Sequence, residues 1–217
     1  RDGRYGPRDH ADAVLRLIEQ RDLRRVTLVG HSLGGGIALL AALDLLDRDP
    51  GRLHSLVLIE AAAVPQDLPP FVRMARLPGI GSLLLRLLPS RTLIRWVLRT
   101  VVHDPSTVTP EQVRGYAAPL ASADVRYGIV ETARRILPDG VERIVERYGQ
   151  IRVPTLLLWG RNDPVIPLRL GRRLHELLPR SRLVILEECG HVPQDERPGL
   201  SLDAVLSFLA DVGDGSG

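Results

Sequence analysis

Two patterns of apolar residues alternate along the chain, one typical of buried strands and the other of helices. Continuous apolar runs rich in Val, Ile and Leu cover residues 26–30, 56–59, 155–159 and 183–186. Because these runs do not alternate with polar residues, they predict strands that are buried on both faces, as in a parallel sheet. Parallel strands require crossover connections, which are usually helices.

Helical spacing is found where those connections are needed. Apolar residues recur at intervals of three and four over 10–20, 34–46, 168–178 and 200–209. This spacing predicts helices with one apolar face toward a sheet. The alternation of strands and helices therefore predicts an α/β fold with a mostly parallel sheet flanked by helices.

A long segment separates the second predicted strand from the third, and it exceeds an ordinary connection in an α/β unit. Its apolar spacing and its prolines predict helices over 71–77, 82–88, 92–101, 110–116, 125–137 and 141–148. We interpret residues 64–150 as a helical cap, or lid. The cap is inserted into a core made of residues 1–63 and 151–217.

Composition excludes several classes of protein. The 217 residues are 44% apolar and 25% charged, enough for one substantial core. The 29 cationic residues, all Arg, are dispersed, the net charge is only +3 and aromatic residues are 4%, so we expect no nucleic-acid partner. Apolar runs are too short for an integral membrane segment. The single Cys189 cannot form an internal disulfide, which favours a reducing compartment, the cytoplasm.

The strongest chemical signal is the run Gly-His-Ser-Leu-Gly at residues 30–34, between a predicted strand and a predicted helix. A serine at such a tight turn has a strained backbone and needs glycines around it, the arrangement called a nucleophile elbow. The turn would present the Oγ of Ser32 above the edge of the sheet. The backbone N–H of Leu33, at the positive end of the helix, would face a developing oxyanion.

A serine nucleophile needs a base, and the base needs an orienting acid. Asp163 follows the third predicted strand and His191 follows the fourth. Loops at the carboxyl ends of parallel strands form the sites of open α/β sheets, so Ser32, Asp163 and His191 are expected to meet.

The sequence resembles the α/β-hydrolase superfamily, specifically its capped, esterase-like members. The resemblance rests on residues 28–35, 157–163 and 190–194, on the order Ser, Asp, His, and on nearly the whole chain. It implies that Ser32 is the nucleophile, His191 the general acid and base, and Asp163 the orienting acid. The expected enzyme is a serine hydrolase that cleaves a carboxylic ester of a small molecule through an acyl-enzyme, without a cofactor.

Some assignments have alternatives. Glu60 also ends a predicted strand, and certain haloalkane dehalogenases resemble this chain in carrying their acid there, so Glu60 is the alternative acid. His31 is expected to line the pocket, and Cys189 to be a small buried residue. No H-x-x-x-H or H-E-x-x-H motif occurs, so we expect no metal.

The reaction and the substrate also remain open at this point. Thioester hydrolysis, hydrolytic C–C cleavage and acyl transfer would use the same three residues. A cap rich in Leu, Ile, Val and Ala predicts an apolar pocket for a small to medium hydrophobic substrate. The sequence indicates no oligomeric state.

The resemblance also implies strands before the elbow strand, with a loop that supplies the second oxyanion N–H. Residues 1–8 contain no strand-like run. We therefore expect an N-terminally truncated piece of a longer hydrolase, with the elbow strand at an open edge of the sheet. An inactive fragment is a further alternative.

Overall fold

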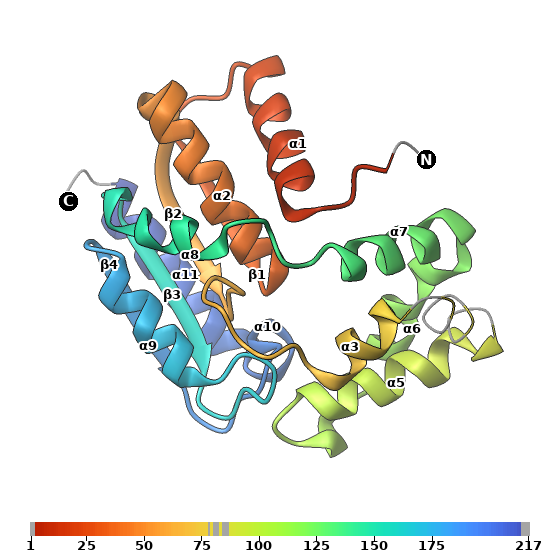
Figure 1. The fold of residues 1–217 in the computed structure, drawn as a ribbon. Helices are drawn as coiled ribbons and strands as arrows, with labels where there is room; N and C mark the ends of the chain where they lie inside the picture. The colour runs from red at the N-terminus through yellow and green to blue at the C-terminus, as the bar shows by residue number, and fades with distance from the viewer. Residues whose placement is uncertain (1–2, 78, 80–82, 84–86, 214–217) are drawn as a thin grey trace.

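The computed structural model describes residues 3–213 except 78, 80–82 and 84–86, and a parallel sheet lies at its centre (Figure 1). Four strands pair in chain order, β1-β2-β3-β4, and each pair is parallel. They are β1 (Val26–His31), β2 (Leu53–Ile59), β3 (Thr155–Gly160) and β4 (Ser181–Leu186). The predicted α/β fold class is confirmed.

The helices α1 (Pro7–Gln20), α2 (Leu33–Arg48), α9 (Leu168–Leu177) and α11 (Pro198–Gly213) flank this sheet. Successive residues of β3 point to opposite faces, and all of them are buried. Leu157 and Trp159 belong to a core cluster shared with α1, α2 and α9. Leu156 packs with Phe208 of α11 on the other face. Helices on both faces explain why the strand sequences are continuously apolar.

The strand β1 lies at one edge of the four described strands. Its Val29 is 61% exposed, whereas the side chains of the neighbouring β2 are mostly buried. β1 pairs with β2 along its length, from Val26 opposite Leu53 to His31 opposite Ile59. The pairing with β2 therefore fixes the position of β1, and it determines where the turn after His31 begins.

Four helices between β2 and β3 are grouped beyond the carboxyl end of the sheet (Figure 1). They are α3 (Pro70–Arg76), α5 (Ser90–Val101), α6 (Pro110–Ala117) and α7 (Ala123–Arg134). The helix α8 (Val141–Glu146) lies beside the core instead, and its Ile144 joins the core cluster. The helix expected over 82–88 falls largely outside the described residues. The helix expected over 125–137 ends at Arg134, because Pro138 disfavours helical backbone just before it. No helix in the described ranges has the length and apolar character to cross a membrane.

Three glycines at the start of α2 face different surroundings. A Cβ added at Gly35 would collide with the side chain and backbone of Ala61, and one added at Gly36 would collide with the backbone oxygen of Ala62. A Cβ added at Gly34 would meet nothing within 4 Å. The close approach of α2 to the segment after β2 therefore depends on Gly35 and Gly36.

This difference predicts opposite outcomes for two adjacent substitutions. Gly35→Ala should lower the free energy of unfolding by about 1–3 kcal/mol, because α2 must move away from Ala61. Gly34→Ala should be neutral or stabilise the protein by up to about 1 kcal/mol, because Ala favours helix. Urea denaturation measures both. Equal stabilities of the two variants would contradict this account of the packing.

Candidate active site

The turn between β1 and α2 has the strained geometry that the glycine pattern predicts. Ser32 has φ 52° and ψ −121°, a backbone conformation that residues other than glycine rarely adopt. Its N–H donates to the Ile59 carbonyl at 2.9 Å, and its carbonyl accepts from the Ala62 N–H at 2.9 Å. A Cβ at Gly30 would collide with the backbone of Gly34. The end of β2 thus holds Ser32 in this conformation.

The structure brings Ser32, His191 and Asp163 together in one hydrogen-bonded row. Ser32 Oγ lies 3.0 Å from His191 Nε2, and His191 Nδ1 lies 2.8 Å from Asp163 Oδ2. His191 and Asp163 are 7% and 5% exposed. Because a carboxylate only accepts, Nδ1 carries the proton and Nε2 is free to accept the proton of the serine hydroxyl. This arrangement can activate a serine as a nucleophile.

Several hydrogen bonds favour the charged form of Asp163. Its Oδ1 accepts from the N–H groups of Val165 at 2.6 Å and Ile166 at 3.0 Å. Burial opposes ionisation, but hydrogen bonds from His191, Glu60 and the Ile166 N–H together hold the pKa of Asp163 below its usual value. A charged Asp163 both orients the imidazole and stabilises an imidazolium.

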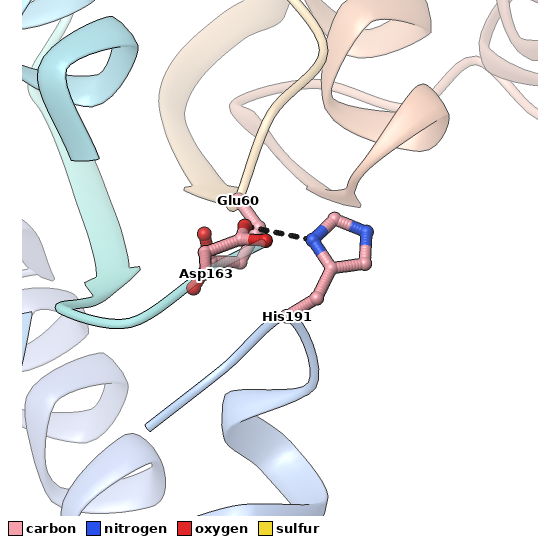
Figure 2. Close-up of side chains that lie close together, drawn as sticks. All are labelled: Glu60, Asp163 and His191. Carbon is pink, nitrogen blue, oxygen red and sulfur yellow. Dashed lines mark hydrogen bonds and ion pairs between the residues drawn. The ribbon is translucent and has the colours of Figure 1, made fainter. Parts of the chain in front are cut away.

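Glu60, the alternative acid, lies directly after β2, and Figure 2 shows its carboxyl group beside that of Asp163. Its Oε1 accepts the Gly160 N–H, whereas His191 Nδ1 donates to Asp163 and not to Glu60. Burial, reinforced by Asp163, raises the pKa of Glu60 to about 12. One ligand atom from each of Glu60, Asp163 and His191 lies within 4.8 Å of the others. A metal ion there would have to break the bond between Asp163 and His191.

His31 and Cys189 lie where the sequence predicts. The His31 ring centroid is 4.9 Å from that of His191, and His31 Nε2 lies 2.7 Å from the His191 carbonyl oxygen, so Nε2 carries a proton. Burial is the main cause that lowers the pKa of His31, and repulsion from a protonated His191 is the second. His31 therefore packs against the His191 loop as a neutral donor. Cys189 is fully buried, and burial raises the pKa of its thiol to about 12.

Sequence reasoning missed Glu196, at the end of the short helix α10 (Pro193–Glu196). Its carboxylate accepts backbone N–H groups from Gly190 at 2.9 Å, Val192 at 3.2 Å and His103 at 2.7 Å. The His191 N–H also donates to the Val101 carbonyl at 2.9 Å. The loop that carries His191 is thus bound to both α10 and the end of α5. An acidic residue soon after His-Val-Pro is the signal that could have indicated this role.

A cavity of about 330 Å³ lies over Ser32 and His191. Its wall is mostly apolar and includes residues of the inserted segment, among them Val64, Phe71, Val97, Ile136 and Val141. The described residues that line it include no Asp, Glu, Arg or Lys. Leu33 also lines the cavity, and its N–H is the first of α2, which leaves it without a partner inside the helix. The cavity can therefore hold an uncharged apolar group next to the serine and a backbone donor.

The comparisons with known proteins agree with this fold. Residues 1–204 match the alpha/beta hydrolase family, and the chain belongs to that family. It is 29% identical over 206 residues to an uncharacterized hydrolase of Bacillus subtilis (strain 168), covering 94% of this chain and 72% of the relative. It spans 62–72% of the length of the curated relatives it matches first.

Other similar proteins have names that specify a hydrolase. A 2-hydroxy-6-oxononadienedioate/2-hydroxy-6-oxononatrienedioate hydrolase from Pseudomonas sp is 28% identical over 214 residues, 97% of this chain and 70% of that protein. The solved structure of a meta-cleavage product hydrolase from Pseudomonas fluorescens IP01 superimposes with a TM-score of 0.75 at 24% identity. That match covers 95% of this chain and 72% of the other. At this identity, the second comparison shows the fold alone.

The contacts of Glu196 predict a measurable effect on stability. Glu196→Ala removes three charge-assisted hydrogen bonds and should lower the free energy of unfolding by about 2 kcal/mol. Glu176→Ala is the matched control, because Glu176 forms only an exposed ion pair with Arg173, worth at most about 1 kcal/mol. Urea denaturation compares the two variants. If Glu196→Ala were no less stable than the control, Glu196 would not hold the loop.

Proposed function

We propose that the chain is a serine hydrolase that cleaves carboxylic esters, with Ser32 as nucleophile, His191 as general base and acid, and Asp163 as orienting acid. One observation carries this proposal: the row of hydrogen bonds from Asp163 through His191 to Ser32 ends at the floor of the apolar cavity. A nucleophile, a base and an oriented acid next to a binding cavity are the parts that acyl transfer requires.

The reaction follows from these positions. Ser32 Oγ attacks the ester carbonyl carbon while His191 Nε2 takes the hydroxyl proton, and the Leu33 N–H donates to the oxyanion. Collapse of the tetrahedral intermediate breaks the bond to the alcohol, which leaves with the proton from His191. Water then attacks the acyl-enzyme while His191 Nε2 takes a proton from the water. The bond between the acyl carbon and Ser32 Oγ breaks, His191 returns the proton to Ser32, and the carboxylic acid leaves.

We further propose that residues 64–150 act as a cap over a core of 1–63 and 151–217. Phe71, Val97 and Ile136 from this segment line the same cavity as Ser32 and His191. A cap of this kind determines which acyl or alcohol groups fit, and it keeps bulk water away from the developing charge.

Hydrolysis of a C–C bond is the second candidate, because the same three residues can serve it and because relatives at 28% identity are named as hydrolases of a 2-hydroxy-6-oxononadienedioate. A dienedioate is a dicarboxylate, and a carboxylate transferred into an apolar cavity without a cation loses much of its hydration energy. The described lining residues include no Arg or Lys. This favours an uncharged ester with a small to medium apolar acyl group as the substrate of this chain.

The proposed role of Ser32 can be tested directly. The protein should hydrolyse p-nitrophenyl butyrate and should be labelled by a fluorophosphonate at Ser32. Ser32→Ala should lower kcat by a factor of about 10⁴–10⁶ and abolish labelling without changing the circular dichroism spectrum. Mass spectrometry of the labelled peptide identifies the residue. A folded protein with neither turnover nor label would favour the inactive fragment.

The proposed preference for an uncharged substrate can also be tested. p-Nitrophenyl butyrate and p-nitrophenyl hemisuccinate have acyl chains of the same length, which end in a methyl and in a carboxylate. We expect kcat/KM for the hemisuccinate to be lower by about 10²-fold, because none of the described residues that line the cavity offers its carboxylate a cation. Equal values, or faster cleavage of a carboxylated β-diketone than of the butyrate ester, would favour the second candidate.

A further inference from the structure

Glu60 is a buried carboxyl group to which the mechanism above assigns no role. It is 0% exposed, and its backbone has φ 47°, a left-handed conformation that residues other than glycine rarely adopt. Its Oε1 accepts the Gly160 N–H, whereas its Oε2 is buried without a hydrogen-bond donor. A buried charged oxygen without a donor is costly, so the environment does not favour a charged Glu60.

Asp163 is the neighbour that Glu60 faces. Figure 2 shows the two carboxyl groups together, on the side of the His191 ring that carries Nδ1. One ligand atom of each carboxyl group lies within 4.8 Å of the other. A hydrogen bond between them requires a proton on one of the two, because carboxylates only accept. Two buried carboxylates at this separation cannot both be ionised without a large repulsion.

The donors around each group decide which one carries the proton. Asp163 receives hydrogen bonds from His191, Val165 and Ile166, whereas Glu60 receives one, from Gly160. A carboxylate with three donors is better stabilised than one with a single donor. The charge therefore belongs on Asp163 and the proton on Glu60.

We propose that Glu60 is a neutral carboxylic acid that donates a hydrogen bond to Asp163 and holds it against His191, as a positioning residue. This inference rests on the proposed function of the row Ser32, His191 and Asp163. The raised pKa of Glu60 agrees with it. When His191 takes the serine proton, its positive charge then faces one negative charge, on Asp163, instead of two.

Among the other titratable groups near Glu60, Glu196 acts in the same direction as Asp163. Glu196 of α10 adds negative charge that disfavours ionisation of Glu60. Cys189 stays a neutral thiol, because burial and then the negative charge of Glu196 raise its pKa to about 12. His191, once protonated, is the group that would favour a charged Glu60, and its contact is with Asp163.

Two substitutions separate a neutral Glu60 from a charged one. Glu60→Gln keeps the size and can donate from its amide, so kcat/KM should stay within about 3-fold, and the acid limb of its pH profile should not move. If Glu60 were charged, its removal would take away a negative charge that stabilises the protonated imidazole, and the acid limb would move to lower pH. Glu60→Leu removes the donor and should lower kcat by about 10–100-fold at nearly unchanged KM. A wild-type kcat in Glu60→Leu would overturn the positioning role.

A spectroscopic test does not depend on turnover. At pH 8, the infrared spectrum of the wild-type protein should contain the C=O stretch of a protonated carboxylic acid, and either Glu60→Gln or Glu60→Leu should remove it. Glu131→Gln is the control and should leave the band unchanged, because Glu131 is ionised between Arg134 and Arg135. A folded wild-type protein without this band would overturn the proposal, whether or not it hydrolyses esters. Conversely, a protein that shows the band but no esterase activity would contradict only the proposed function.

Discussion

The backbone of Ser32 is the constraint on which the site depends. Its strained conformation is stabilised because both its N–H and its carbonyl bond to the chain at the end of β2. The same close approach requires glycines at 35 and 36, where α2 passes Ala61 and Ala62. The pairing of β1 with β2 therefore determines the position of Oγ, and a slip in register would displace the serine together with the start of the helix.

The order of the strands explains why residues far apart in the chain meet. β2, β3 and β4 are neighbours in the sheet and parallel, so their carboxyl ends lie next to one another. Glu60, Asp163 and His191 come from the segments after these three strands. The long insertion between β2 and β3 does not disturb this arrangement, because both of its ends return to adjacent strands.

Strands, flanking helices and the serine turn could be predicted from the sequence because each has a local signal: continuous apolar runs, helical spacing, and glycines around a serine. The acid that bonds to His191 could not be decided in this way. Glu60 and Asp163 both follow strands, and what distinguishes them is three-dimensional: His191 bonds to Asp163, and Asp163 has more N–H donors around it. Glu196 was missed because acidic residues are common in the first turn of any helix.

The contacts between α5 and the His191 loop have a consequence for the exchange of parts between related proteins. The carbonyl of Val101 and the N–H of His103 make these contacts, so the end of α5 takes part through its backbone. One cavity-lining side chain adds to this joint, because the Tyr116 hydroxyl donates to Asp195 of α10 at 2.8 Å. The apolar side chains that line the cavity make none of these hydrogen bonds. A foreign insertion grafted between β2 and β3 would have to reproduce the backbone path at this joint, whatever its sequence.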